Sequence, residues 1–159
     1  ENVKDWKDED EVTGYLTKIL NKEAHDRTGL VYGMGHAVYT KSDPRAIILK
    51  KKAKELAEVK GRSDEYTLYT NIEKITPNLF QQIKQSSKVV SPNVDFYSGF
   101  VYDLLDFPRE IYTPIFAMSR VVGWCAHRME ELINGKRIIR PAYKNVENFH
   151  DYIPLKKRN

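Results

Sequence analysis

The 159-residue sequence predicts an all-α fold. Apolar residues recur at steps of three and four along most of the chain, which is the period of an amphipathic helix. Capping residues, prolines and glycines separate these periodic stretches, as they do at helix ends. No stretch has the convincing alternation of apolar and polar residues that marks a half-buried strand. With 41% hydrophobic and 30% charged residues, the chain has the composition of a globular domain with its own core.

The first helix is expected over residues 8–23. Acidic residues open it and lysines follow, which is the order that the helix dipole favours. One face is expected to be buried, because its apolar residues form a single stripe. The residues of that stripe are Val12, Leu16, Ile19 and Leu20.

The second helix is expected to begin at Pro44, because Asp43 can cap the free backbone amides and proline suits the first helical position. Gly61 ends it. Its apolar face consists of Ala46, Leu49, Ala53 and Leu56. Lysines occupy the other faces at positions 50–52 and 54. A solvated face is the favoured interpretation of these lysines over nucleic-acid binding, because no aromatic stacking residues are interleaved with them.

The third helix is expected to start at Ser63, whose hydroxyl can serve as the N-cap. Pro77 is expected to break or kink it. Its apolar face is Leu68, Ile72, Ile75, Leu79 and Ile83. The fourth helix is expected from Asn93 to about Leu105. It has Asp95 in its first turn, where a carboxylate is ordinarily an electrostatic cap but can also face a cleft.

The longest helix is expected over residues 109–134, before the stop signal at Gly135. Its apolar stripe is Ile111, Ile115, Met118, Val122, Ala126 and Met129. Arg120 lies in this apolar run, and a buried arginine requires an anion, either a structural ion-pair partner or a bound ligand. From Lys136 onward the sequence lacks an apolar period, so an extended arm that packs on another surface is expected.

Composition limits the classes of function. No apolar run approaches the length of a membrane span, and the acidic opening residues lack the features of a secretory signal. The single cysteine, Cys125, excludes an internal disulfide and favours a reducing, cytoplasmic setting. No set of ligand residues predicts a metal site. The formal net charge of +4 comes from 26 basic and 22 acidic residues that are interspersed, which does not favour nucleic acid as a partner.

The stretch from Leu30 to Arg45 holds the principal candidate site. Gly33 and Gly35 precede His36, so this backbone can take positive φ or let a ligand approach closely. Arg45 stands in the first turn of the second helix, where free amides, the helix dipole and a guanidinium favour a carboxylate. These residues alone fit two interpretations. Either a histidine and an arginine hold a small anion, or a tight turn gives both residues structural roles.

Four motifs in register carry a resemblance to a known family. They are GMGHAVYTKSDPR from residue 33, SPNVDFYSG from residue 91, FAMSRVVGW from residue 116 and RIIRPAY from residue 137. In their order and spacing the chain resembles the C-terminal portion of the citrate synthase family. The resemblance implies an all-α enzyme of the tricarboxylic acid cycle. Such an enzyme condenses acetyl-CoA with oxaloacetate and water to give citrate and CoA, and its small mobile domain closes over a large one.

The resemblance also implies roles for single residues. His36 corresponds to the histidine that hydrogen-bonds the oxaloacetate carbonyl, whose oxygen gains negative charge as carbon attacks. Asp95 corresponds to the base that removes a proton from the acetyl methyl group. Arg45 and Arg120 correspond to arginines that hold the oxaloacetate carboxylates. Arg140 corresponds to a third arginine, supplied across a dimer interface.

The loop of residues 30–35 resembles the segment that receives the adenine of CoA through backbone groups. Thr40 stands where some members carry a phosphate-binding arginine, which leaves Lys41 as its substitute. The CoA-binding residues implied in this way are Leu30, Val31, Gly33, Met34, Gly35, Lys41 and Lys88. No permanently bound cofactor is implied, since acetyl-CoA and CoA are substrate and product.

The resemblance divides the chain into a small (lid) domain, residues 1–103, and a helix and arm of the large domain, residues 104–159. The family's other catalytic histidine lies upstream in the large domain and has no counterpart here, because His25 lacks the surrounding motif. The sequence also starts at Glu1 rather than at a methionine. We therefore expect a fragment of a homodimeric enzyme that is inactive alone.

The sequence is compatible with three alternatives. The first is 2-methylcitrate synthase, which uses propionyl-CoA in the same fold. The second is a non-catalytic module that binds CoA or a dicarboxylate. The third is a basic helical nucleic-acid binder, which would show a steep dependence of affinity on salt.

Overall fold

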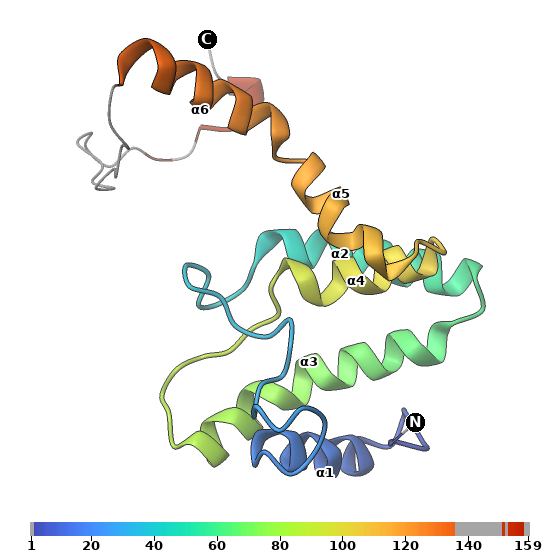
Figure 1. The fold of residues 1–159 in the computed structure, drawn as a ribbon. Helices are drawn as coiled ribbons and strands as arrows, with labels where there is room; N and C mark the ends of the chain where they lie inside the picture. The colour runs from blue at the N-terminus through green and yellow to red at the C-terminus, as the bar shows by residue number, and fades with distance from the viewer. Residues whose placement is uncertain (1, 136–150, 152, 158–159) are drawn as a thin grey trace. The chain divides into compact units, whose positions relative to one another are not determined.

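The computed structural model describes residues 2–135, 151 and 153–157. Within these residues the chain forms α-helices and two short 3-10 helices, without a strand, so the predicted all-α fold is confirmed. Figure 1 shows the helices in chain order. They are α1 (Glu9–Leu20), α2 (Pro44–Val59), α3 (Ser63–Lys84), α4 (Val94–Leu104), η1 (Arg109–Ile111), α5 (Tyr112–Met118), α6 (Val121–Asn134) and η2 (Leu155–Lys157). One isolated antiparallel bridge joins Met34 to Pro92.

The chain divides into two compact units, residues 1–115 and 116–159, and the division falls inside α5. The first unit contains α1 to α4 and the connections between them. The second unit contains the end of α5, then α6 and η2. The domain boundary expected after residue 103 stays a prediction. Arg140 lies outside the described residues, as does most of the expected C-terminal arm.

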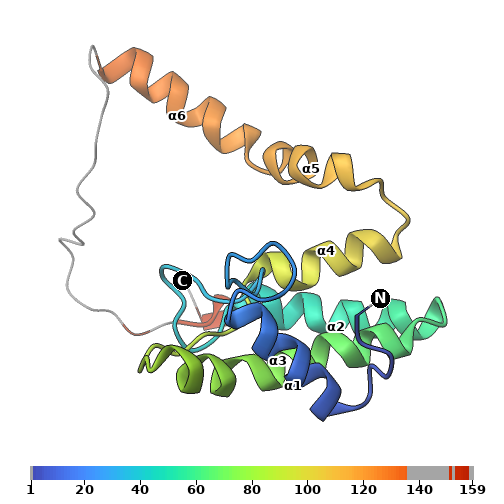
Figure 2. The same ribbon diagram turned by 60° about the horizontal axis from the view of Figure 1, so that its bottom comes forward.

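The core of the first unit forms where α2 packs on α4, with α3 beside them (Figures 1 and 2). Alanines on α2 let the aromatic residues of α4 approach closely. The buried cluster consists of Ala46, Ala53 and Ala57 of α2 with Phe96, Tyr97, Phe100, Val101 and Leu104 of α4. Tyr69 of α3 stacks on Phe100 with ring centroids 4.4 Å apart, which ties the third helix to this cluster.

A second apolar contact joins α1 to α3, which lie side by side in both ribbon views. Val12, Leu16 and Leu20 of α1 are buried, as their spacing predicts. Asp8 caps α1 by accepting hydrogen bonds from two backbone amides of its first turn. The helix ends at Leu20, three residues before the expected end at position 23.

The cap predicted for α2 and the start predicted for α4 are confirmed, whereas the cap predicted for α3 is not. Asp43 caps α2, with Pro44 in its first turn, and Asn93 caps α4. The N-cap of α3 is Arg62 rather than Ser63, and it makes no side-chain capping bond. Instead, the Arg62 guanidinium pairs with Glu65 and with Asp103 of α4, which draws the start of α3 towards α4. Pro77 lies inside α3, which continues past it to Lys84.

The prediction of one long helix over residues 109–134 is wrong. A turn at Ser119 and Arg120 separates α5 from α6. The Ser119 hydroxyl donates to the Phe116 carbonyl at 2.7 Å, and the Arg120 amide donates to the Ala117 carbonyl at 2.9 Å. The Ser119 bond comes from a side chain, and the Arg120 bond spans three residues rather than the four of an α-helix. The regular helical bonds are therefore interrupted here, and the apolar stripe does not continue as one helix.

The arginine that was expected inside an apolar helix therefore lies at this turn and is exposed. The Arg120 guanidinium stands over the Phe116 ring, 4.6 Å from its centroid. Large apolar side chains of α6, among them Val122, Trp124 and Ile133, are also exposed. The expectation of a buried Arg120 is thus wrong for the described residues, and its role in binding stays a prediction.

The lysines of α2 have the ion pairs of a solvated helix face. Lys52 pairs with Glu55 at 2.8 Å, and Lys50 reaches Glu73 of α3 at 2.7 Å. Of the helices that the structure describes, none combines the length and the apolar character needed to cross a bilayer.

Candidate active site

The glycine loop before His36 is shaped by two residues with positive φ. Gly33 has φ +78° and Gly35 has φ +92°, a region that favours glycine. A Cβ atom at Gly33 would lie 2.8 Å from the Phe96 backbone and 2.9 Å from its side chain. Gly33 therefore allows the loop to contact the first turn of α4 directly. The close neighbour of Gly33 is thus this helix, and the ligand approach expected from the sequence stays a prediction.

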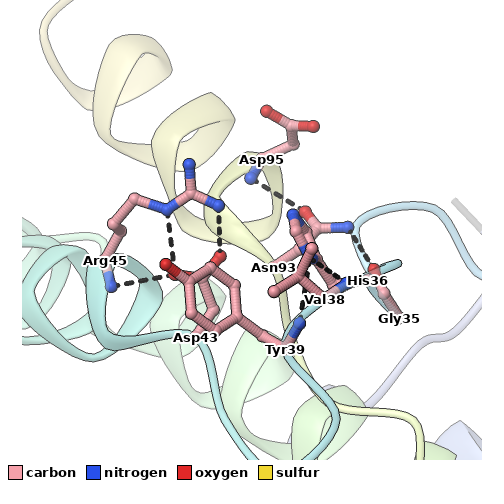
Figure 3. A network of polar contacts seen from close by, with 8 residues as sticks. All are labelled: Gly35, His36, Val38, Tyr39, Asp43, Arg45, Asn93 and Asp95. Carbon is pink, nitrogen blue, oxygen red and sulfur yellow. Dashed lines mark hydrogen bonds and ion pairs between the residues drawn. The ribbon is translucent and has the colours of Figure 1, made fainter. Parts of the chain in front are cut away.

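Hydrogen bonds join the same loop to the segment that leads into α4. The Gly35 amide donates to the Ser91 carbonyl at 2.7 Å, and the Asn93 amide donates to the Gly33 carbonyl at 2.8 Å. The Asn93 side chain donates from Nδ2 to the Gly35 carbonyl at 2.8 Å and accepts at Oδ1 from the Asp95 amide at 2.9 Å (Figure 3). The loop before His36 and the helix that carries Asp95 are thus one hydrogen-bonded assembly.

His36 is half-buried and its ring is held by the backbone that follows it. Nδ1 accepts hydrogen bonds from the amides of Val38 at 2.9 Å and Tyr39 at 3.1 Å (Figure 3). The Tyr39 ring also packs against the imidazole, with centroids 4.9 Å apart. An Nδ1 atom that accepts two amides carries no proton, so the ring proton of the neutral imidazole is on Nε2. His36 is therefore built to donate a hydrogen bond from Nε2.

Arg45 is oriented by Asp43 at the start of α2. Asp43 is fully buried, and its oxygens accept from Nε of Arg45 at 3.0 Å and from a terminal guanidinium nitrogen at 2.8 Å. The Asp43 carboxylate also caps the Arg45 amide at 3.0 Å. These bonds from Arg45 hold the pKa of Asp43 below its usual value against the opposing effect of burial. The pairing was not predicted.

Arg45 can still donate hydrogen bonds to another group while it is paired with Asp43. Its side chain is 40% exposed, and the second terminal nitrogen points away from Asp43 (Figure 3). The hydrogen bonds to Asp43 raise the pKa of Arg45, and the Asp95 carboxylate adds a smaller contribution in the same direction. The guanidinium also lies over the Tyr39 ring, 5.4 Å from its centroid. Asp43 therefore fixes the orientation of the Arg45 guanidinium, whose other terminal nitrogen remains free to bind an anion.

Asp95 stands in the first turn of α4 and is exposed. Among the described residues its carboxylate accepts no hydrogen bond, and in Figure 3 it points away from the Asn93 side chain. The structure therefore brings His36, Arg45 and Asp95 to one place, at the junction of the glycine loop with the N-termini of α2 and α4. Arg120 belongs to the second unit.

A cavity of about 160 Å³ lies beside this junction. Its lining residues are Gly29, Leu30, Val31, Met34, Gly35, Thr76, Phe80, Lys88 and Val90. Five of these were predicted as CoA-binding residues. Gly33 and Lys41, which were also predicted, do not line it. Among the described residues, no group of His, Cys, Asp and Glu side chains is arranged to hold a metal ion.

Several residues of this region were missed by the sequence predictions. Asp43 was identified as a cap but not as the partner of Arg45, and Asn93 was identified as a helix start but not as a link to Gly35. Thr76 and Phe80 reach the cavity from α3. The Thr76 hydroxyl is buried and has no partner among the described residues. No local pattern marks these residues, because their neighbours in space are distant in the sequence.

Comparisons with known proteins place the chain in a family. The profile of the family described as citrate synthase, C-terminal domain, matches residues 1–142. Citrate synthase of Synechocystis is 39% identical over 92% of this chain and 34% of its own length, and that of Deinococcus radiodurans is 38% identical over 94% and 37%. The chain thus spans about a third of the length of these relatives.

Solved structures give the same result. The crystal structure of citrate synthase from Pyrobaculum aerophilum is 35% identical, with a TM-score of 0.61, over 92% of this chain and 35% of that one. The Thermoplasma acidophilum enzyme, solved as a ternary complex with carboxymethyl coenzyme A and oxaloacetate, is 32% identical, with a TM-score of 0.62, over 97% and 41%. The chain therefore belongs to the citrate synthase family.

Proposed function

We propose that this chain works as the C-terminal portion of a citrate synthase, in a protein that condenses acetyl-CoA with oxaloacetate. The main support is the meeting of three groups at one junction: the Nε2–H donor of His36, the oriented guanidinium of Arg45 and the carboxylate of Asp95. Each has a position in a family motif. Together they supply a donor, a cation and a base, which a condensation of this kind requires.

In the proposed reaction Asp95 removes a proton from the methyl group of acetyl-CoA. The methyl carbon of the enolate that forms then attacks the carbonyl carbon of oxaloacetate. His36 stabilises the charge that grows on the carbonyl oxygen, because its Nε2–H is available and its orientation is fixed through Nδ1. Arg45 binds a carboxylate of oxaloacetate through its free edge. Hydrolysis of the thioester product then gives citrate and CoA.

Asp95 needs help that the described residues do not provide. A carboxylate is a weak base in water, and Asp95 is exposed. The proposal therefore assigns two further contributions to the rest of the enzyme. These are an acid on the thioester oxygen, identified with the family's upstream histidine, and a surface that excludes water from Asp95. By the same reasoning the 159-residue chain alone is proposed to be inactive.

The cavity is proposed to receive the adenine end of CoA. Its walls include Leu30, Val31 and the flat ring of Phe80, which suit a planar base, and Lys88 offers a positive charge for a phosphate. The carboxymethyl coenzyme A in the Thermoplasma complex shows that a member of this family binds such a ligand. Lys41 is proposed only on its motif position.

Other features are proposed from the family motifs alone. Arg120 and Arg140 would bind the carboxylates of oxaloacetate, the latter across the interface of a homodimer. No permanently bound cofactor is proposed, and acetyl-CoA is a substrate. A cytoplasmic location is proposed for the whole protein.

The test is the release of free thiol from acetyl-CoA in the presence and absence of oxaloacetate. It compares the full-length protein that carries this chain with the 159-residue chain alone. We expect oxaloacetate-dependent turnover from the full-length protein and none from the chain. Turnover with propionyl-CoA in preference to acetyl-CoA would instead identify a 2-methylcitrate synthase. Turnover by the isolated chain would refute the assignment of the missing acid to another segment.

A further inference from the structure

Asn93 is the one described residue whose side chain links the backbone next to His36 with the backbone of Asp95. Its Nδ2 donates to the Gly35 carbonyl at 2.8 Å, across 58 residues of sequence, and its Oδ1 accepts from the Asp95 amide at 2.9 Å (Figure 3). Both bonds have normal lengths for N–H···O contacts. One side chain of four heavy atoms therefore connects the two segments that carry the proposed catalytic groups.

Both bonds act on the backbone from which those groups extend. The Gly35 carbonyl and the His36 amide belong to one planar peptide unit, so a bond that fixes the carbonyl oxygen also fixes the nitrogen of His36. The Asp95 amide is bonded to the Cα atom from which the carboxylate extends. Asn93 thus fixes the backbone nitrogens of His36 and Asp95, while the Val38 and Tyr39 amides orient the imidazole itself.

Helix capping alone does not account for an asparagine at this position. Serine, aspartate and asparagine cap helices about equally well, because each offers an oxygen to the free amides. Only the asparagine side chain adds an N–H donor at the same length, and this donor reaches Gly35. The other bond of Asn93 to the loop comes from its backbone amide, which most replacements at position 93 would keep.

We propose that Asn93 is a positioning residue that holds the His36 imidazole and the Asp95 carboxylate in register. This inference rests on the proposed function, since the two groups act on the two substrates of the condensation. The rate of such a step depends on the relative placement of the reacting groups, and a displacement of about 1 Å costs roughly 10²-fold. Oxaloacetate is proposed to contact His36 and Arg45, whereas Asp95 acts on the acetyl group, so the register between His36 and Asp95 matters for the reaction step.

The test is Asn93→Ser in the full-length protein, because serine keeps the cap of α4 and removes the donor to Gly35. We expect kcat to fall by about 10²-fold, with KM values for oxaloacetate and acetyl-CoA close to those of the wild type. The matched control is Asn71→Ser. Asn71 also donates from its side-chain amide to a distant carbonyl, that of Trp6 at 2.9 Å, but it lies outside the site. The control is expected to lose stability and to keep its kcat.

A kcat for Asn93→Ser equal to that of Asn71→Ser would overturn the proposal, as would a raised KM for oxaloacetate with unchanged kcat. If Asn93→Ser does not fold, Asn93→Asp serves as the second variant, because it keeps the size of the side chain and the cap without the donor. An asparagine needed only as a cap would leave Asn93→Asp at the wild-type rate. A wild-type protein without oxaloacetate-dependent turnover would refute the proposed function itself, which is a separate outcome.

Discussion

The chemistry of His36 depends on which ring nitrogen carries the proton. Two backbone amides donate to Nδ1, so the neutral ring must present its N–H at Nε2. This feature belongs to the short chain segment from His36 to Tyr39 and needs no ligand. In the proposed reaction the ring would therefore be ready to donate to a substrate carbonyl before any substrate binds, as in a preorganised electrostatic site.

We predict that nitrogen NMR of the 159-residue chain at neutral pH finds His36 as the Nε2–H tautomer, with Nδ1 unprotonated. The long-range proton–nitrogen couplings of the ring distinguish the two nitrogens directly. The exposed His127 serves as the internal reference for a ring that exchanges between tautomers. A proton on Nδ1 of His36 would contradict the hydrogen bonds from Val38 and Tyr39.

Asp43 is the second residue whose environment leads to a measurable prediction. Arg45 lowers the pKa of this buried carboxyl group, so the charged form stabilises the folded state. A lowered folded pKa means that this contribution is complete above the unfolded pKa, at about 4, and is lost as pH falls through the folded value. Asp43→Asn should therefore be less stable than the wild type at neutral pH, and the difference should shrink below about pH 4.

The expected loss for Asp43→Asn at pH 7 is about 1 kcal/mol, which is less than is usual for a hydrogen bond to a charged group, because Arg45 is partly exposed and solvent screens the pair. Urea unfolding at pH 7 and at pH 3 measures it. The control is Asp8→Asn, which alters the N-cap of α1, where the carboxylate has no arginine partner among the described residues. An equal loss in both variants at both pH values would assign the effect of Asp43 to capping alone.

At the scale of elements, local signals predicted the helices better than their connections. Asp43 with Pro44 and Asn93 gave the starts of α2 and α4, because caps are read from adjacent residues. The turn at Ser119 was not predicted, since the apolar stripe continues through it. The Asn93–Gly35 link and the cavity wall from α3 join residues far apart in the sequence. No periodic pattern contains such information.

The contact between the glycine loop and α4 gives a prediction for an element pair. Gly33→Ala would put a methyl group within 3 Å of Phe96 and require an alanine at φ +78°. We expect the free energy of unfolding to fall by about 2 kcal/mol or more, from the left-handed backbone and the overlap together. Gly14→Ala is the matched control, because Gly14 lies inside α1 with no atom near the added methyl group.

For Gly14→Ala we expect a gain of about 0.5–1 kcal/mol, as alanine replaces glycine in a helix. Thermal or urea unfolding of both variants and of the wild type measures these changes in the free energy of unfolding. A Gly33→Ala protein as stable as the wild type would show that the loop can move away from Phe96, and the close contact would then not be what holds the loop against α4.

For the whole molecule, the family relationship and the site come from different evidence. Family membership follows from the match over residues 1–142 and from relatives close to 40% identity. The site is proposed from His36, Arg45 and Asp95, which all belong to the first compact unit. The chain covers about a third of those relatives, so its chemistry has to be tested in the full-length protein.

The most direct test of the proposed roles is Asp95→Asn in the full-length protein, measured for turnover and for oxaloacetate binding by calorimetry. Asp95 is proposed to act on the acetyl group, whereas oxaloacetate is proposed to contact His36 and Arg45. We therefore predict that turnover falls by about 10²–10⁴-fold, the usual contribution of a positioned base, while the Kd for oxaloacetate stays near the wild-type value. A loss of oxaloacetate affinity as large as the loss of turnover, or turnover that is unchanged, would contradict this account.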